Sequence, residues 1–488
     1  SPTGHPEPVA TTWSLSFNKV EQASPAAADL LRACVFLAPD AIPEDLLLRE
    51  AAEGGIELQA IAKNPFLWNE TIGELLKYSL VRRNREHKAL SIHRLVQAVL
   101  KDSMDEPTIQ QWVERTIHAV GQAFPSNIDP TTWVSCARLL PHAQACLVLV
   151  EQHNLASPEA AHLFGQAAFY LKEHGRYTEA EPLYQHALAL REKVLGSKHP
   201  DTATSLHNLG HLYHSQGRYE LAEPLYQHAL TLRKDVLGPE HPDTAICLNN
   251  LGHLYHSQGQ YELAERLYQN ALTISEKMLG PLHPDTAKSL HNLGLLYDHQ
   301  GRYKLAERFY QHALAISEKV LGPLHPDTAK SLHNLGLLYD HQGQYELAEP
   351  LYQRALDIID KVLGPQHPDT ATCLNNLGTL YYNQGRYELA KPLYQRALTT
   401  CEKVLGPLHP DTALSFHNLG SLYHKQGQYE LAEPLFQSTL TIYEKVLGPE
   451  HLNTAITLGN YAKLLRNMGQ TKEAEELEVR AAAIREKQ

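Results

Sequence analysis

Histidines recur at regular positions in this sequence, and their side chains are among those that a function could use. His207, His211 and His214 stand at i, i+4 and i+7, a spacing that puts all three on one face of a helix. Imidazoles placed in this way can bind a metal ion. Because no carboxylate or cysteine joins the set, a solvated polar groove is the better interpretation, and we predict no metal site.

Asparagines form a second recurring set, one in each copy of the pattern. An amide offers two donors and an acceptor, so a ladder of asparagines can hydrogen-bond a peptide backbone whatever its sequence. The alternative is that each asparagine ties its helix to the adjacent repeat or loop, and the sequence leaves both open. The predicted ligand-binding residues are Asn208, Asn250, Asn292, Asn334, Asn376 and Asn418, together with His207, His211, His214, His253, His256, Asp298, Asp340, Tyr382 and His424.

These side chains belong to a repeat of 42 residues. The glycines that mark it are Gly175, Gly217, Gly259, Gly301, Gly343, Gly385, Gly427 and Gly469. A fixed period in this range is typical of a solenoid. Apolar residues at helical spacing predict one helix over 200–216 and another over 219–236 in the second copy. Gly217 separates the two, because glycine enters the left-handed region without steric cost.

Two further features follow the same period. Seven histidines stand where first helices begin, and we predict a structural role for them: His199, His241, His283, His325, His367, His409 and His451. Five prolines lie inside second helices, where proline costs roughly 3 kcal/mol: Pro182, Pro224, Pro350, Pro392 and Pro434. Arg266 and Arg308 take the equivalent place in two repeats, so this position is predicted to face water at a local bend.

The repeat resembles the tetratricopeptide repeat. Leu209-Gly210, Tyr213, Ala222, Tyr226 and Ala229 match the spacing of that motif from Leu-Gly through Tyr to Ala, aromatic and Ala. The usual unit has about 34 residues, and the extra residues here lengthen the second helix and its loop. This long form, with its LGP-x-HPDTA joint, is similar to the repeats of kinesin light chain and of bacterial and fungal signalling ATPases. The resemblance implies that first helices line a concave groove.

The first part of the chain lacks the repeat. Helices are predicted over residues 26–36, 44–52, 71–79 and 94–101, with a turn at 39–43. Two short strands, 80–83 and 89–93, flank a charged tip and predict a β wing. Two more helices are predicted over 109–124 and 131–152, the second interrupted near Pro141.

The predicted fold is therefore all-α apart from the wing: a superhelical solenoid preceded by a winged-helix module. Its predicted parts are a winged-helix domain at 1–104, a helical connector at 105–157, the tandem repeat array at 158–469 and a C-terminal capping helix at 470–488.

The N-terminal module has a resemblance of its own. The segments 12–17, 28–40, 76–80 and 92–97 resemble the region after the nucleotide-binding core of NB-ARC proteins, which are STAND signalling ATPases. In that family, the His of a Met-His-Asp motif contacts the phosphate of the bound nucleotide. The matching positions are Ile92, His93 and Arg94. The resemblance thus implies that His93 is a nucleotide sensor in a full-length protein.

Composition limits the function classes. The net charge of −12 argues against general affinity for nucleic acid or anionic lipid. The six cysteines are scattered without CxxC spacing, and no run approaches the roughly 20 apolar residues that span a bilayer, so we predict a cytoplasmic protein with reduced thiols. The chain has no G-x-x-x-x-G-K-[ST] loop, so it is not expected to be an enzyme or to hold a cofactor. ADP or ATP is expected only in a full-length protein.

Three functions fit these features. The leading hypothesis is the sensor half of a STAND ATPase, whose array binds a protein or peptide ligand and signals through the winged helix to a nucleotide-binding domain outside this sequence. Oligomerisation is expected only together with that domain. The alternatives are a constitutive adaptor of the kinesin-light-chain type and a STAND-type transcription regulator. The absence of heptads disfavours the first, and the acidic balance of residues 1–104 disfavours the second.

Overall fold

The computed structural model describes residues 7–52 and 56–486. The first six residues, the segment 53–55 and the last two residues of the predicted cap lie outside this description. The chain divides into two compact units. One comprises residues 1–170 with 182–197, and the other comprises 171–181 with 198–488.

The first unit is built mainly from helices around one small sheet. Its helices are α1 (Glu7–Ala23), α2 (Pro25–Val35), α3 (Glu44–Ala52), α4 (Ile56–Ala62), α5 (Pro65–Lys77), α6 (Arg94–Asp102), α7 (Glu106–Ala123) and α8 (Trp133–His153). Helix α2 is the central one, because it packs against α1, α3, α5 and α6 and buries eight of its eleven residues. Helices α1 and α4 were not predicted, and α5 begins six residues earlier than expected.

The predicted wing is present as β2 (Val81–Asn84) and β3 (Ala89–Ile92), an antiparallel hairpin. A third strand, β1 (Ile42–Pro43), pairs with the other edge of β3 and corrects the prediction that residues 39–43 are only a turn. Pairing across nearly fifty residues leaves no local signal, which is why the sequence did not indicate it. Glu44 follows β1, is buried, and its carboxylate accepts hydrogen bonds from Arg83 on β2 and from Trp68.

Helix α8 corrects two predictions. It runs through Pro141 without the expected interruption. It is also the one helix of the described residues that is long and apolar enough to cross a membrane by length and composition, although the sequence was expected to hold no such run. In the fold α8 packs against α7 and β1 and buries the side chains of Leu139, Leu140, Leu149 and Val150, as a core helix does.

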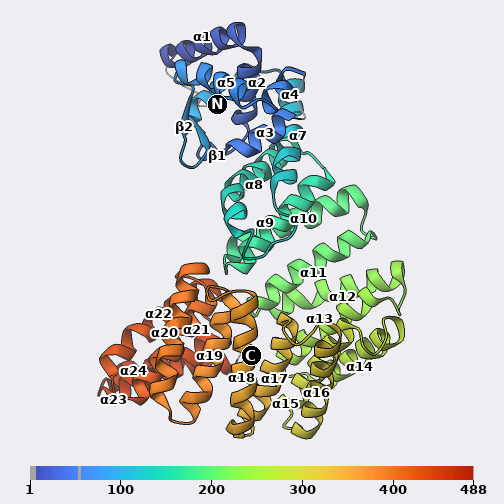
Figure 1. Cartoon of the computed structure of the whole chain (residues 1–488), viewed down its shortest axis with the longest axis vertical. Coiled ribbons are helices and arrows are strands. Elements are labelled where there is room, and N and C mark those ends of the chain that lie inside the picture. Colours follow the sequence, from blue (N-terminus) through green and yellow to red (C-terminus); the bar gives the residue numbers. More distant parts are fainter. Residues whose placement is uncertain (1–6, 53–55, 487–488) are drawn as a thin grey trace. The chain divides into compact units, whose positions relative to one another are not determined.

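The repeats form eight helix pairs (Figure 1). The first helices are α9 (Pro158–Glu173), α11 (Pro200–Ser215), α13 (Pro242–Ser257), α15 (Pro284–His299), α17 (Pro326–His341), α19 (Pro368–Asn383), α21 (Pro410–Lys425) and α23 (Leu452–Asn467). The second helices are α10 (Tyr177–Leu195), α12 (Tyr219–Leu237), α14 (Tyr261–Met278), α16 (Tyr303–Val320), α18 (Tyr345–Val362), α20 (Tyr387–Val404), α22 (Tyr429–Val446) and α24 (Thr471–Glu486).

Each predicted helix boundary in the repeat has a physical cause. The loop histidine is the N-cap residue of the first helix: Nδ1 of His283 accepts the backbone N–H of Asp285 at 3.1 Å, and the other six histidines do the same. Their structural role is thereby confirmed. Gly217 ends its helix at φ +70°, in the left-handed region that glycine reaches without strain.

The two helices of a repeat approach closely at a glycine. A Cβ built on Gly294 would lie 2.7 Å from the ring of Tyr310, which is almost fully buried. Across repeats, the hydroxyl of Tyr297 donates to Glu265 at 2.7 Å. Within its own repeat, the Tyr297 ring has the guanidinium of Arg302 4.5 Å from its centre. Four of the five prolines inside second helices face water as predicted, namely Pro224, Pro350, Pro392 and Pro434, whereas Pro182 is half-buried.

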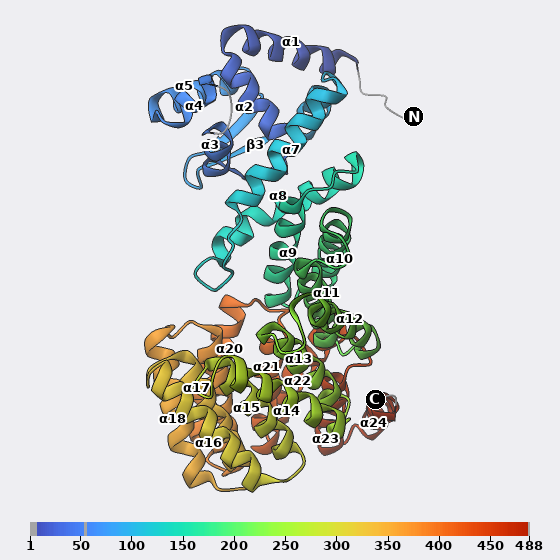
Figure 2. The same cartoon turned by 90° about the vertical axis from the view of Figure 1, so that its right-hand side faces the viewer.

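The array turns back on itself within the second unit. Nε2 of His409 lies 3.1 Å from the carbonyl oxygen of Glu173, which is 236 residues earlier. Gly175 is packed against Pro410, and Gly217 is packed in the same way against His451. One superhelical turn therefore takes between five and six repeats, and successive turns touch through their loops (Figure 2).

Candidate ligand-binding surface

First helices form the inner side of the curved array. Neighbouring first helices contact each other directly, as α13 does α15, α15 does α17, α19 does α21, and α21 does α23. Helices that touch from repeat to repeat follow the shorter, inner path. The side chains that these helices turn toward the hollow side of the array therefore line a concave wall on which a ligand can lie.

The asparagine row is bonded across this wall. The amide nitrogen of Asn334 lies 2.9 Å from Nδ1 of His291, the residue before the equivalent asparagine of the preceding repeat. Asn250, Asn376 and Asn460 face His207, His333 and His417 in the same way at 3.1 to 3.4 Å, and Asn418 donates to Asn375. Asn249, which takes the histidine position in its repeat, donates to Ser289 of the next repeat. The amides thus stabilise contacts between repeats, which is one of the two roles that the sequence left open.

The histidines of this row are held neutral. Burial lowers the pKa of His207, His291, His333 and His417 to about 4. Nearby positive charges add to the effect at His207, where Arg233 and Lys172 also disfavour the protonated ring. A neutral imidazole keeps a lone pair, which is what the asparagine amide requires of its partner.

A second row of contacts runs one to two turns further along each first helix. Nε2 of His214 lies 3.1 Å from the hydroxyl of Ser257, and the rings of His256 and His299 are stacked with centroids 4.6 Å apart. Asn383 donates to Asp340, and Asn467 to His424 at 2.8 Å. Each pair joins two successive repeats, so the wall is braced along two parallel lines.

One pair in this second row joins a histidine to a carboxylate. Nδ1 of His341 lies 3.1 Å from Oδ2 of Asp298, whose side chain is buried. The hydrogen bond to that carboxylate raises the pKa of His341, opposite in direction to the inner histidines. The other oxygen, Oδ1 of Asp298, is buried without a hydrogen-bond partner.

The predicted site residues therefore lie on the first helices, but most of them contact the protein itself. His253 is exposed on the wall, with its ring 4.9 Å from that of His214. Burial lowers the pKa of His211 to about 3, and that of His256 to about 4. Tyr382 and His424 are half-buried against Tyr387 and Tyr429. Their contact with a ligand stays a prediction.

Sequence reasoning missed the most exposed row of the wall, which lies four residues before each asparagine. Its members are Thr204, Ile246, Lys288, Lys330, Thr372, Leu414 and Ile456. Ile246, Leu414 and Ile456 are 40 to 43% exposed, unusual for large aliphatic side chains that recur on one face. The signal was available, since i and i−4 share a helix face and this position varies among Thr, Ile, Lys and Leu along the array.

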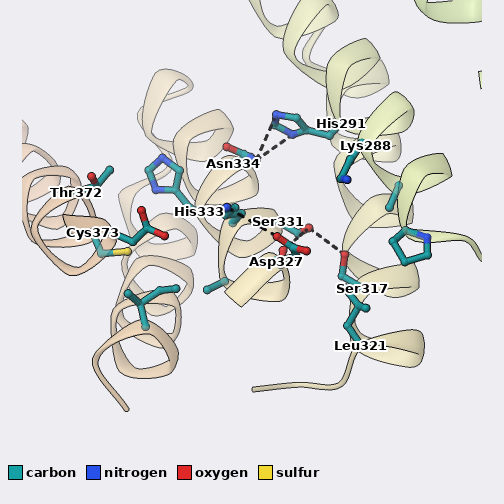
Figure 3. Close-up of a pocket in the computed structure, with 16 residues that line it drawn as sticks. Lys288, His291, Ser317, Leu321, Asp327, Ser331, His333, Asn334, Thr372 and Cys373 are labelled. Atoms are coloured by element: carbon teal, nitrogen blue, oxygen red, sulfur yellow. Dashed lines mark hydrogen bonds and ion pairs between the residues drawn. The ribbon is translucent and has the colours of Figure 1, made fainter. Parts of the chain in front are cut away.

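A cavity of about 400 Å³ opens beside this row, between α15, α17 and α19 (Figure 3). Lys288 and Lys330 stand at it from equivalent places in repeats four and five, and the hydroxyls of Ser317 and Ser331 lie 3.3 Å apart within its lining. The apolar part of the lining consists of Pro284, Ala287, Leu321, Ala329, Ile359 and Cys373. The cavity is large enough to accept bulky side chains of a bound polypeptide.

In the first unit, His93 caps its own helix. Nδ1 accepts the backbone N–H of Leu95 at 3.2 Å, and the ring lies 5.5 Å from that of Trp13. The side chain is exposed, so Nε2 remains directed away from the helix it caps. Its role as a nucleotide sensor stays a prediction. Across residues 7–52 and 56–486, no three histidine, cysteine or acidic side chains converge as a metal site would require.

Comparison with protein families gives two matches. A model described as "Tetratricopeptide repeat" matches seven overlapping segments, 159–235, 209–277, 249–319, 285–359, 327–403, 374–445 and 411–487. A domain of unknown function (DUF7779) matches residues 18–109. A "Nucleotide-binding leucine-rich repeat (NLR)-like protein" of Hyaloscypha variabilis is 36% identical over 202 residues, which cover 41% of this chain. The match spans 19% of that relative's length.

Among solved structures, a STAND protein with a tetratricopeptide repeat sensor from Pyrococcus horikoshii has a TM-score of 0.50 at 16% identity. That alignment covers 94% of this chain and 64% of the other. A Rap protein complexed with competence and sporulation factor also scores 0.50, at 14% identity, over 78% of this chain and 99% of its own. Identities this low indicate a shared fold alone.

Proposed function

Because the chain belongs to the tetratricopeptide repeat family, we propose that it is the protein-binding sensor part of a larger STAND-type signalling protein. The observation that carries this proposal is that two different rows of residues on the inner wall have different surroundings. Asparagines and histidines brace the wall between repeats, whereas the row from Thr204 to Ile456 is exposed at every position except Thr204 and varies among Thr, Ile, Lys and Leu. A rigid wall with a variable exposed row is suited to recognising one polypeptide among many.

The ligand in this proposal is a protein or peptide that lies along the exposed row. The NLR-like relative, whose name denotes a nucleotide-binding protein, supports the wider assignment. In that protein class the array would act on a nucleotide-binding domain through the N-terminal module, with His93 facing the nucleotide. Ligand binding can switch such a domain only if it favours one of two states of the whole protein. The repeats themselves bind and do not catalyse.

Site-specific photo-crosslinking tests the binding face. A photoreactive amino acid is placed at Ile246, Leu414 or Ile456 on the inner wall, and at the somewhat more exposed Leu347 or Leu431 on second helices as a control. The full chain is irradiated in extract from cells that express it. A discrete adduct from the inner positions, identified by mass spectrometry and bound again as purified protein, supports the proposal.

The same experiment can overturn the proposal. Adducts that form only from Leu347 or Leu431, or equally from both faces, would mean that the inner wall does not select a partner. A second test uses the purified partner with K288E/K330E, and K319E/K361E on second helices as the control. The inner pair should weaken binding about tenfold or more, whereas the control pair should change it less than about twofold.

A further inference from the structure

The contact between superhelical turns is made by parts that every repeat carries. One half is a loop histidine at the start of a first helix, and the other is the glycine loop at the end of a first helix. At the first such contact, Nε2 of His409 lies 3.1 Å from the carbonyl oxygen of Glu173 and Pro410 packs on Gly175. At the second, His451 packs on Gly217. The same two kinds of loop therefore meet twice in one chain.

Helix capping determines which side of this contact donates the hydrogen bond. Nδ1 of His409 accepts the N–H of Asp411 at 3.0 Å, so the ring hydrogen of the neutral imidazole is on Nε2, which points out of the loop as a donor. Its acceptor is a main-chain carbonyl in the last turn of a first helix, where carbonyls lack an intrahelical partner. Neither half depends on a particular side chain of the facing loop, apart from the histidine itself.

Glycine is required on the accepting side for steric reasons. A Cβ on Gly175 would lie 2.7 Å from Cδ of Pro410, and a Cβ on Gly217 would lie 2.9 Å from Cδ2 of His451. The side chains of the facing loop thus pack directly against the main chain of the glycine loop. Every repeat keeps glycine here because it ends the first helix at positive φ, so every repeat is able to accept a histidine loop.

Most copies of both halves are not used within the chain. No described atom lies within 4 Å of a Cβ built on Gly259, Gly301, Gly343, Gly385, Gly427 or Gly469. On the other edge, the side chains of His283 and His325 are 39 and 40% exposed, whereas that of His409 is 10% exposed. Leu282 and Leu324, next to these histidines, are 43 and 61% exposed, and Leu408 beside the seated His409 is 46% exposed, so only the histidine side chains distinguish open from seated loops. One edge of the array carries open acceptor loops, and the other carries open donor loops at His283 and His325, whereas His367 is only 15% exposed.

We propose that a second copy of this chain docks edge to edge on the array, with its open histidine loops seated on the open glycine loops of the first. The argument is continuity: the new contact repeats one that the chain already makes with itself. Because the two halves differ, the interface is heterologous, and such interfaces build open chains of subunits unless the geometry closes them. This association does not rest on the proposed ligand, and it would need no nucleotide-binding domain, unlike the oligomerisation expected from the sequence.

Each loop contact is small, so several must form in register before the complex is stable. Association should therefore be reversible and should grow with protein concentration. The arrangement also predicts that the individual loop contacts contribute additively to association. Repeats three, four and five present the same His-Pro-Asp-Thr-Ala loop through His241, His283 and His325. Removing these donors one after another should weaken association in steps.

Sedimentation velocity on the full chain, from about 1 to 300 μM, tests the proposal. In the variant H241N/H283N/H325N, asparagine still caps each helix but lacks the outward Nε2 donor. The wild type should shift to species larger than a dimer as concentration rises, and the variant should associate at least about tenfold more weakly. A second variant, L282E/L324E, should have the same effect by placing charge at the edge without changing a cap.

The matched control is H409N/H451N, which changes the two histidine loops already seated within the chain. It should lower the thermal midpoint of the array and leave the association constant within about twofold. A wild type that stays monomeric across the whole range overturns the proposal. So does a triple variant that associates as the wild type does, or a control that weakens association as much as the triple variant.

Discussion

The amide nitrogen of Asn334 lies 2.9 Å from Nδ1 of His291 in the preceding repeat. His291 stands one residue before the asparagine that is equivalent to Asn334. That offset makes each asparagine a link between two first helices, and the stability of the wall should depend on it. Asn334→Ala should lower the free energy of unfolding by about 1–2 kcal/mol, since it leaves a desolvated ring nitrogen without its donor.

Urea denaturation of the full chain measures this loss. Asn270→Ala, at an exposed position on a second helix, is the matched control and should stay within about 0.5 kcal/mol of the wild type. If Asn334→Ala were equally silent, the asparagine would have to be kept for a ligand and not for the contact between repeats.

Acid should destabilise the array because its inner histidines are neutral. Their pKa of about 4 in the folded chain lies below the usual 6.5 of an unfolded one, so the unfolded state binds more protons between these values. Their contribution is complete above pH 6.5 and is lost as pH falls toward 4. Each proton taken up on unfolding costs about 1.4 kcal/mol per pH unit.

Urea midpoints at pH 8, 7, 6 and 5 should fall steeply below 6.5. His228→Asn, at an exposed histidine on α12, should leave that slope unchanged. His341 acts in the opposite sense: its pKa is raised by Asp298, so its contribution is present at low pH and is lost as pH rises through the raised value. A profile that is flat from pH 8 to 5 would contradict the neutral state of the inner rings.

Gly294→Ala tests the close approach of the two helices in a repeat. Helix propensity alone predicts a gain of about 1 kcal/mol, but the added methyl would meet the buried ring of Tyr310 at 2.7 Å. Overpacking should win and lower stability by about 1–3 kcal/mol. Gly73→Ala, in α5 with no described atom near the new methyl, should stabilise the first unit; thermal unfolding of both variants gives the two signs.

Replacing the proline inside a second helix should increase the stability of the array. Pro350 is exposed, and its repeat-four equivalent is Arg308. Pro350→Ala restores a backbone donor and should raise the free energy of unfolding by about 1–3 kcal/mol. Arg308→Pro is the reciprocal change and should lower it. Calorimetry that shows no difference in either direction would mean that the early helical turn accommodates proline without cost.

The repeat structure could be predicted because its causes are local. Gly217 ends a helix through its own backbone freedom, and His199 caps one through the next two residues. Strand β1 could not be predicted, because Ile42 and Pro43 acquire their strand conformation from Leu90 and Ala89, far along the chain. Pro141 was expected to interrupt α8, but the helix continues through it.

The contacts between first helices could be predicted only in part. First helices, and the stripe that carries Asn334, were identified from spacing. Which polar residues face each other depends on how one repeat is rotated against the next, and that rotation brings Asn334 to His291 and Asp298 to His341. No spacing within a single repeat encodes it. The exposed residues Lys288 and Lys330 were overlooked because the asparagines were the more regular signal.

The seating of His409 on Gly175 has a consequence for how such a chain can change in length. Segments 281–301 and 323–343 are identical, as expected of recent tandem duplication. If one unit of 42 residues were gained, the loop opposite Gly175 would come from a neighbouring copy with the same His-Pro-Asp sequence. The superhelix would close as before, so the number of units is free to increase in evolution while the geometry of the coil is inherited unchanged.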